Sequence, residues 1–290
     1  MKLDYISARG GVLPLVGNEL FSLTNVDGQT SAAASIASSA VGGVDGAMVN
    51  SVQANARSIV IDLRIRSGVD VEEAKREILK IVKIKQHGKL VWEQNGKAVE
   101  ISGVVESIEM PRWSNAVAMQ ITLFCDQPFW EDVADIVQEI NEAISLHYFT
   151  DDPNDMLYFP AEGIAFGEYD ASRAKKVFND GDVAVGVEIM VVAYGEVTNP
   201  IIYDAEGNFF GIGHGNGSKQ VKMKAGDNIH ITTHKGRKSV TLNGKNILPK
   251  LRPRSTWLQL QAGQNTFNID SDDDSLINMT FTLTYRQRYV

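Results

Sequence analysis

The sequence is poor in cysteine and lacks a long hydrophobic run. Its 290 residues contain one cysteine, Cys125, which excludes an internal disulfide framework and any metal site built from several cysteines. No apolar stretch approaches the ~20 residues needed to cross a bilayer, and the opening MKLDYISARGG lacks the basic and then apolar layout of a secretory signal. We therefore expect folding in the cytoplasm, no membrane insertion, and a role for Cys125 as a small core residue on a strand.

Motifs that carry catalysis or bind cofactors are also missing. The sequence has no Gly-x-Ser-x-Gly elbow, no His-Glu-x-x-His and no convincing pair of carboxylates for one cleft. His230 and His234 lie in a segment with a strand pattern, where ~3.3 Å per residue would place them roughly 13 Å apart, too far to share a zinc ion. We predict no enzymatic activity, no cofactor, and no catalytic, cofactor-binding or metal site.

Two further patterns imitate ligand loops and fail in detail. Asp270, Asp272 and Asp274 have the spacing of a calcium loop, but its twelfth position is Phe281 instead of Glu. The glycine-rich segment 211–217 lacks the Lys-Ser/Thr pair and the following helix of a phosphate cradle. We interpret the first as a solvated acidic turn and the second as a flexible loop.

Charge is distributed unevenly along the chain, whose formal net charge is -8. Residues 131–170 contain 11 Asp or Glu and no Lys or Arg, whereas residues 219–254 contain ten Lys or Arg and the single acid Asp227. The basic stretch is either a solvated face or a surface that docks on an acidic one, such as residues 131–170 of a neighbouring subunit. In the second case raised salt loosens the assembly, because exposed charges are screened within ~8–10 Å at physiological ionic strength.

Residues 1–130 show a mainly β pattern with one helix. Apolar alternation predicts strands over KLDYIS, ELFSLTNV and ARSIVIDLRIR, the last with inward positions from Ile59 to Ile65. Asp70 caps a predicted helix that continues to Val82, and Glu73 completes a capping box. Asn95-Gly96 predicts a hairpin between KLVWEQ and KAVEIS.

Two other segments are predicted to be a loop and a helix. Residues 28–47 are rich in Ser, Ala and Gly, offer little to bury, and are predicted to form a mobile loop. Residues 131–147 are predicted to form a second helix that ends near Pro153. Its apolar stripe would consist of Val133, Ile136, Val137, Ile140, Ala143 and Ile144.

From about residue 171 the pattern is almost wholly β. Many short strands, separated by turn residues such as Glu206-Gly207-Asn208 and Asn243-Gly244, predict an antiparallel sandwich. Strands do not alternate with helices, which argues against a parallel α/β enzyme fold. The predicted fold class is mostly β with few helices. The predicted divisions are residues 1–130, an acidic helix and linker at 131–170, and a β-sandwich at 171–290.

Four segments, in their order, are characteristic of one family. They are LFCDQPFW (123–130), KVFNDGDVAVGVEIMVVAYGEVTNPIIYD (176–204), AGDNIHITTHKGRKSVTLNGKNIL (225–248) and STWLQLQAGQNTFNID (255–270), followed by the terminal strand MTFTLTYRQRYV. Together they resemble the distal tail protein (Dit) family of long non-contractile phage tails and related prophage tails. The resemblance covers residues 123–290, and the first domain matches in layout only.

The resemblance implies a structural virion protein. Its N-terminal domain would be a split β-barrel with one helix, related to tail-tube folds, and its C-terminal domain a galectin-like sandwich. Six copies would form a hexameric ring, a baseplate hub at the distal end of the tail, after assembly in the cytoplasm of the host bacterium.

The same resemblance names the expected partners. They are the tail tube protein, tail-tip or tail-associated proteins and receptor-binding proteins, while DNA passes through the lumen without specific binding. Acidic or neutral lumen side chains would let DNA slide, because cations attract its phosphates. Trp92, Trp113 and Trp257 are either interface anchors or core residues.

A carbohydrate-binding module for adhesion to the host surface is the alternative function. Galectins that bind sugar carry His-x-Asn-Pro-Arg and Trp-x-x-Glu-x-Arg, whereas here Asn199-Pro200 is followed by Ile201, and Trp257 by Leu-Gln-Leu. The alternative predicts exposed aromatic residues that line a groove on the C-terminal sandwich. A third hypothesis, a wall hydrolase, requires paired carboxylates or a metal, for which the sequence gives no support.

Overall fold

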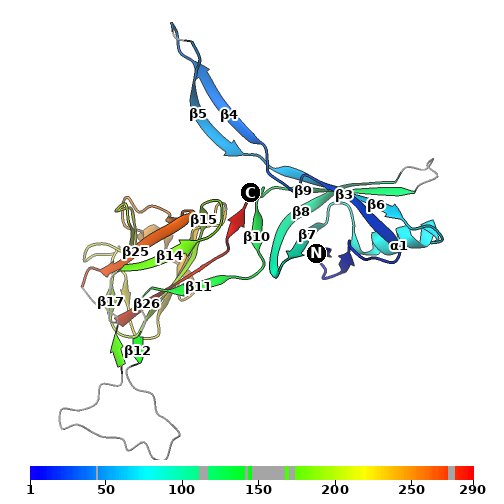
Figure 1. Cartoon of the computed structure of the whole chain (residues 1–290). Coiled ribbons are helices and arrows are strands. Elements are labelled where there is room, and N and C mark those ends of the chain that lie inside the picture. The colour runs from blue at the N-terminus through cyan, green and yellow to red at the C-terminus, as the bar shows by residue number, and fades with distance from the viewer. Residues whose placement is uncertain (44, 111–116, 141–142, 146–166, 170–173, 274–277) are drawn as a thin grey trace, which may run out of the picture. The chain divides into compact units, whose positions relative to one another are not determined.

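A computed structural model describes residues 1–290 except 44, 111–116, 141–142, 146–166, 170–173 and 274–277. The chain divides into two compact units (Figure 1). Unit 1 comprises Met1–Ala134 and Arg288–Val290, and unit 2 comprises Asp135–Gln287. The last three residues therefore belong to the unit in which the chain begins. The predicted linker at 131–170 stays a prediction, since much of it lies outside the described residues.

Unit 1 is built on a nine-stranded antiparallel sheet. Its main path has the order β2-β1-β7-β8-β9-β6-β3, and β10 pairs with both β8 and β27. The strands are β1 (Lys2–Ser7), β2 (Val12–Pro14), β3 (Phe21–Asp27), β6 (Arg57–Ile65), β7 (His87–Gln94), β8 (Lys97–Glu109), β9 (Ala118–Cys125), β10 (Trp130–Asp132) and β27 (Arg288–Tyr289). The mostly β fold class is confirmed.

The two local signals predicted within unit 1 are confirmed. In β6, every second side chain from Ile59 to Ile65 is buried. Asn95 and Gly96 join β7 to β8 with φ values of 53° and 80°. Positive φ at both central residues is what a tight hairpin turn requires, because it matches the twist of the flanking strands.

The single α-helix of the described residues, α1, spans Val71–Ile81. Oδ1 of Asp70 accepts the backbone N–H groups of Glu72 at 2.8 Å and Glu73 at 3.4 Å. The cap satisfies donors that have no partner inside the helix. The inner face of α1 packs on the core of unit 1, as its apolar spacing predicts.

Residues 28–47 do not form the predicted loop. β4 (Ala34–Ala40) and β5 (Ala47–Ala54) pair as a hairpin that runs away from the nine-stranded sheet (Figure 1). All of its described residues are exposed, from the first of β4 to the last of β5. The prediction was wrong because cross-strand backbone hydrogen bonds can form without a buried side-chain face.

Residues 131–147 do not form the predicted second helix. Their described part contributes to β10 and forms β11 (Ile136–Glu139) and β12 (Ala143–Ser145). β11 pairs with β26 (Met279–Tyr285), and its Val137 is 59% exposed. The apolar residues of this segment are mostly β-branched, which favours an extended chain. Strand pairing therefore outweighs the helical spacing.

Unit 2 is a sandwich of two antiparallel sheets. The six-stranded sheet has the order β11-β26-β16-β21-β22-β23, and the four-stranded sheet has the order β14-β25-β18-β19. Three two-stranded pairs are β12–β13, β15–β24 and β17–β20. The remaining bounds are β13 (Gly167–Tyr169), β14 (Ala174–Asn179), β15 (Val185–Gly186), β16 (Glu188–Ala193), β17 (Val197–Thr198), β18 (Pro200–Asp204), β19 (Phe209–Gly211), β20 (Lys222–Met223), β21 (Asn228–Thr232), β22 (Ser239–Leu242), β23 (Lys245–Asn246), the 3-10 helix η1 (Leu248–Lys250), β24 (Gln259–Leu260) and β25 (Gly263–Ser271).

Each unit has its own hydrophobic core. The core of unit 2 takes side chains from both sheets, such as Phe281 of β26 and Phe267 of β25. The core of unit 1 lies between its sheet and α1 and includes Cys125. No helix of the described residues is both long and apolar enough to span a membrane.

Cys125 is expected to resist thiol reagents in the folded protein. Its thiol is fully buried, and burial raises its pKa from 9.0 to about 11. At pH 8 the native protein should therefore react with a maleimide only after urea unfolds unit 1, as mass spectrometry would detect. Between pH 9 and 11 the unfolded chain loses a proton that the folded chain keeps, so the stability of unit 1 should fall as pH rises through this window. Rapid labelling under native conditions would contradict the burial of the thiol.

Candidate interaction surfaces

His230 and His234 lie beside one carboxylate. Their Nε2 atoms are 3.4 Å and 3.9 Å from the two carboxylate oxygens of Glu188. β21 ends at Thr232, so the straight-strand geometry that separates the two histidines does not extend to His234. Across the described part of the chain, no group of three or more His, Cys, Asp or Glu side chains is arranged to hold a metal ion.

The aspartates at the end of β25 and just after it bind other groups of unit 2. Asp272 forms an ion pair with Arg252, whose Nη2 lies 2.6 Å from Oδ1, and it accepts a hydrogen bond of 2.7 Å from Nδ2 of Asn199. Oδ1 of Asp270 accepts the backbone N–H of Ser271 at 2.9 Å. Asp274 lies outside the described residues. Asp272 is thus part of a network within unit 2.

The glycine-rich segment 211–217 packs around an asparagine. Gly213 has a φ of 80°, and a Cβ atom built there would lie 2.1 Å from Oδ1 of Asn199. Nδ2 of Asn199 donates to the carbonyl oxygen of Gly215 at 3.4 Å. The segment therefore encloses a buried side chain, which is a structural role.

Part of the basic stretch 219–254 is engaged within unit 2. Nζ of Lys219 donates to the carbonyl oxygen of Pro249 at 2.7 Å, and Nζ of Lys238 lies 5.4 Å from the ring centroid of Trp257. Salt-sensitive docking of this stretch on residues 131–170 of a neighbour stays a prediction.

The candidate tryptophan anchors are largely committed to packing. Trp92 contacts Trp130 edge to face, with ring centroids 6.0 Å apart. The ring centroids of Trp257 and Phe210 are 5.0 Å apart. Both lie partly buried against the core of their unit. Trp113 lies outside the described residues.

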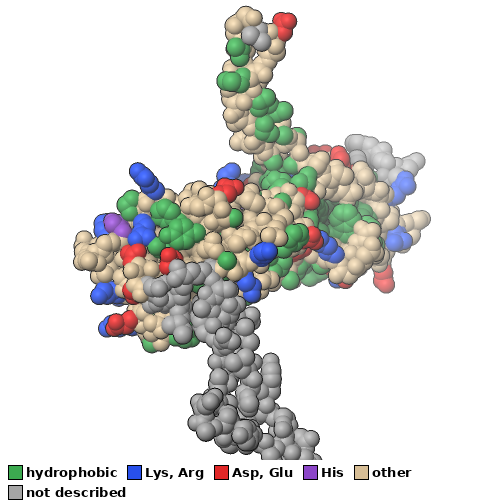
Figure 2. All heavy atoms as spheres, turned by 60° about the vertical axis from the view of Figure 1, so that its left-hand side comes forward, with side chains coloured by type: hydrophobic (Ala, Val, Ile, Leu, Met, Phe, Trp, Pro, Cys, Tyr) green, Lys and Arg blue, Asp and Glu red, His purple; other side chains and the backbone are tan. Residues whose placement is uncertain are grey.

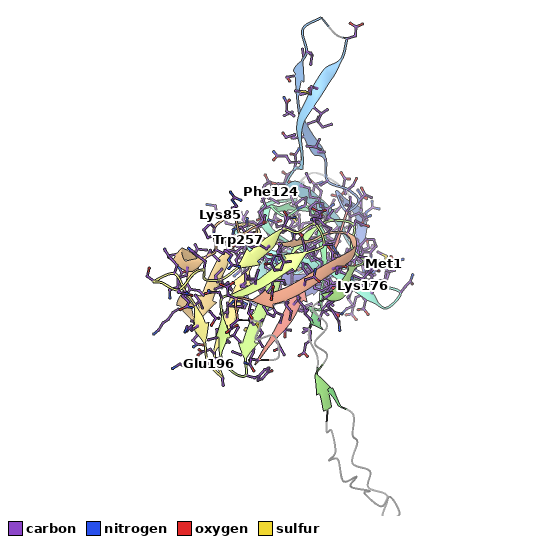
Figure 3. The ribbon with its side chains drawn as sticks, turned by 90° about the vertical axis from the view of Figure 1, so that its left-hand side faces the viewer. Met1, Lys85, Phe124, Lys176, Glu196 and Trp257 are labelled. Atoms are coloured by element: carbon purple, nitrogen blue, oxygen red, sulfur yellow. The ribbon has the colours of Figure 1, made fainter. Side chains whose placement is uncertain are left out.

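The β4–β5 hairpin exposes several large apolar side chains of unit 1. Figures 2 and 3 show hydrophobic side chains spread along it and side chains that point outward from both strands. Asp45 is the only Asp, Glu, Lys or Arg of residues 28–56. The exposed large hydrophobic residues are Ile36, Val41, Met48, Val49 and Val52. A sequence signal exists, since these residues, four of them β-branched, flank the glycines of a turn.

Two buried side chains fix the root of this hairpin. Nη1 of Arg57 donates to the carbonyl oxygen of Thr30 at 2.9 Å, and Nε1 of Trp130 donates to that of Gln29 at 3.0 Å. Within the described chain, Nε and Nη2 of Arg57 have no hydrogen-bond partner, and burial lowers the pKa of this guanidinium. A buried cation held in this way ties the base of the hairpin to unit 1 at a cost in desolvation.

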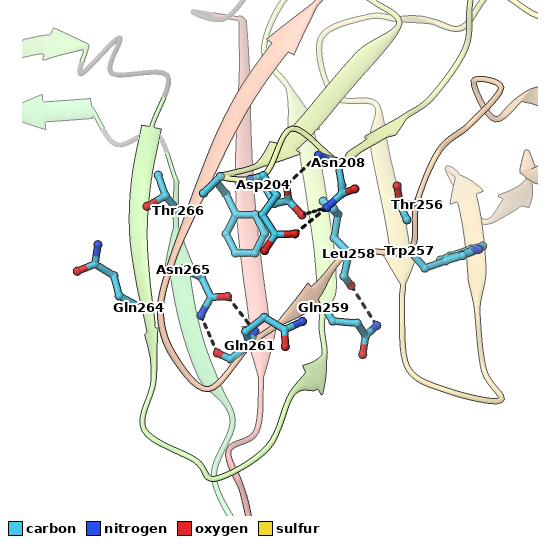
Figure 4. A pocket seen from close by; sticks show the side chains of 13 residues that line it. Asp204, Asn208, Thr256, Trp257, Leu258, Gln259, Gln261, Gln264, Asn265 and Thr266 are labelled. Carbon is cyan, nitrogen blue, oxygen red and sulfur yellow. Dashed lines mark hydrogen bonds between the residues drawn. The ribbon is translucent and has the colours of Figure 1, made fainter. Parts of the chain in front are cut away.

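Unit 2 carries a polar pocket of about 370 Å³ (Figure 4). Its lining comes from the turn between β18 and β19, from the chain that leads into β24, and from β25. The lining residues are Asp204, Ala205, Glu206, Asn208, Thr256, Trp257, Leu258, Gln259, Gln261, Gln264, Asn265, Thr266 and Phe267. No Lys or Arg is among them, and sequence reasoning did not find this site because its members are generic turn and strand residues.

Known phage tail proteins resemble both units. A family model described as the siphovirus-type tail component, C-terminal domain, matches residues 180–289. Another, described as a phage tail protein RIFT-related domain, matches residues 17–125. A search of curated proteins gives no match.

Solved structures resemble the whole chain. The Dit protein of phage SPP1, described as a paradigm of the hub adsorption apparatus in phages that infect Gram-positive bacteria, aligns over 98% of this chain and 98% of its own, with 13% identity and a TM-score of 0.65. Two structures of the phage p2 baseplate in its activated conformation, with Ca and with Sr, cover 100% of this chain and 99% of theirs at 11% identity and a TM-score of 0.46.

Two β units, each matched by the model of a phage tail domain, define a structural protein of a phage tail. The chain belongs to the siphovirus distal tail protein (Dit) family and is a distal tail or baseplate hub component. The predicted resemblance is confirmed. Proteins of this hub family are generally non-enzymatic.

Proposed function

We propose that six copies of this protein form a ring at the distal end of the tail, which joins the tail tube to tail-tip and receptor-binding proteins. The lumen of the ring would let DNA pass, with acidic or neutral side chains toward it. The observation that carries the proposal is the β4–β5 hairpin, whose uncharged strands expose large apolar side chains and have no cover of their own.

The hairpin suits a contact between copies. Ile36 pairs directly with Val52 across the hairpin, and each is 62% exposed. Exposed apolar patches of this kind mark interaction sites, because water disfavours them. An arm on one copy that binds a different surface of the next copy gives a head-to-tail interface, and such interfaces form a ring when the rotation between successive copies closes.

Mass measurement in solution and electron microscopy of the purified chain test the ring itself. A six-fold annulus is expected, with a central passage. A persistent monomer at every concentration tested would contradict the proposal.

Adding charge to the apolar pair should break the ring. The double substitution Ile36→Lys with Val52→Lys is expected to weaken association on the order of 100-fold or more, because burial of an aliphatic side chain is worth about 1.5–3 kcal/mol. Ser35 and Gln53 pair one position away and point to the opposite face, so Ser35→Lys with Gln53→Lys is the matched control. Sedimentation velocity should show monomers for the first variant and rings for the control. If the Ile36/Val52 variant still forms rings, the hairpin is not part of the interface between copies.

A further inference from the structure

The polar pocket of unit 2 has the size of a small-ligand site. Its volume of about 370 Å³ lies within the ~300–1,000 Å³ of typical ligand pockets. Figure 4 shows amide, hydroxyl and carboxylate groups around it, with Trp257 at one side. Buried Phe267 contributes an apolar part to the lining. The pocket lies wholly within unit 2.

One set of lining groups is held in place by hydrogen bonds. Oδ1 of Asp204 accepts the backbone N–H groups of Glu206 at 2.9 Å and Asn208 at 2.8 Å. Asn265 accepts the N–H of Gln261 at 2.8 Å and donates to its carbonyl oxygen at 2.7 Å. These bonds fix the turns on two sides of the pocket before any ligand arrives, which lowers the entropy lost on binding.

A second set is available to a ligand. The side chains of Gln261, Gln264 and Thr256 are exposed, and the described structure gives them no hydrogen-bond partner. A carboxamide offers two donors and one acceptor atom, and a hydroxyl offers both functions. Glu206 adds an exposed carboxylate, which accepts only.

The charge of the lining selects the class of ligand. Asp204 and Glu206 are acidic and no Lys or Arg is among the lining residues, so the lining disfavours phosphates and other anions. Vicinal hydroxyl groups both donate and accept, which matches carboxamides beside a carboxylate. β25 is paired on both sides, by β14 and β18, so its edge offers no place for an added peptide strand.

We propose that this pocket binds a neutral saccharide, in addition to the architectural role of the chain. The site shares Trp257 with the galectin pattern tested on the sequence, but it does not use Asn199. Asn199 of that pattern is 1% exposed and its carboxamide is bonded to Val221, Gly215 and Asp272. The contacts to the sugar come instead from Gln261 and Gln264.

Binding can be measured on the full chain. Glucose, galactose, rhamnose, N-acetylglucosamine and their short oligomers are the neutral probes, glucose 6-phosphate is the charged probe, and hexaserine is the peptide probe. Saturation-transfer NMR and calorimetry should show saturable binding of at least one neutral saccharide, about tenfold or more weaker binding of the phosphate, and no binding of the peptide.

Matched variants locate the site. Gln261→Ala with Gln264→Ala should weaken saccharide binding about tenfold or more by removing two sets of hydrogen bonds. Gln127→Ala, an exposed glutamine of unit 1, should leave it unchanged. Both variants should keep the ring, which separates this proposal from the architectural one. The proposal is overturned if no saccharide shows saturable binding, if only hexaserine binds, or if the Gln261/Gln264 variant binds the saccharide as well as the parent protein does.

Discussion

Replacing Asn199 with alanine is expected to lower the free energy of unfolding of unit 2 by about 3 kcal/mol. Asn199 is 1% exposed, yet its side chain is polar and its φ is 52°. Oδ1 accepts the backbone N–H of Val221 at 2.8 Å, and Nδ2 donates to Asp272 at 2.7 Å. One side chain therefore links the start of β18 to the chain before β20 and to the turn after β25.

Two physical effects add in this substitution. Alanine leaves the N–H of Val221 buried without an acceptor, which costs about 1–3 kcal/mol. Alanine is also disfavoured in the left-handed region that asparagine tolerates, by roughly 1–2 kcal/mol. Urea unfolding, followed by hydrogen exchange resolved by mass spectrometry, should show the loss in unit 2 and leave unit 1 unchanged.

Asn243 is the matched control for Asn199. It has a φ of 48° and also makes two side-chain hydrogen bonds, to the N–H of Asn228 at 2.9 Å and to Asp227 at 2.7 Å, but it is exposed. Water can replace its partners, so Asn243→Ala should cost mainly the left-handed penalty, about 1–2 kcal/mol. Asn199→Gly keeps the backbone conformation without the amide and should lie between the two alanine variants. Equal losses for Asn199→Ala and Asn243→Ala would show that burial of the network contributes nothing.

Local signals predicted much of the fold. The alternation from Ile59 to Ile65, the cap at Asp70 and the turn at Asn95-Gly96 each depend on residues close in sequence, and each forms as expected. The turns of unit 2 follow the same rule, with Gly207 and Gly244 at positive φ. Such signals suffice where the neighbours along the chain decide the conformation.

The wrong predictions concern segments whose conformation depends on residues far away in the sequence. Helical spacing in residues 131–147 was real, but β26, about 140 residues later, supplies the pairing that makes Ile136–Glu139 a strand. The hairpin of β4 and β5 has no buried face, so its sequence resembled a loop. The polar pocket joins residues 204–208 to residues 256–267, and no spacing rule connects these two segments.

Replacing Gly88 with alanine is expected to destabilise unit 1 by about 3 kcal/mol. Gly88 in β7 pairs with Gly103 in β8, and the ring of Tyr5 in β1 lies against it. A Cβ atom at Gly88 would lie 2.3 Å from Oη and 2.5 Å from Cζ of Tyr5. The Tyr5 side chain is 1% exposed, so it cannot swing into solvent and either the ring or the strands must shift.

A double-mutant cycle isolates this contact. Tyr5→Leu removes the ring atoms that the new methyl group would meet, so Gly88→Ala should cost less than about 1 kcal/mol in that background. Gly217→Ala is the control, since a Cβ atom there has no neighbour within 4 Å and its φ is not positive. Urea unfolding followed by tryptophan fluorescence, with hydrogen exchange in β1 and β7, measures each corner of the cycle. A cost for Gly88→Ala that is the same with Tyr5 and with Leu at position 5 would show that the glycine is required by the backbone, and not by the aromatic ring that covers it.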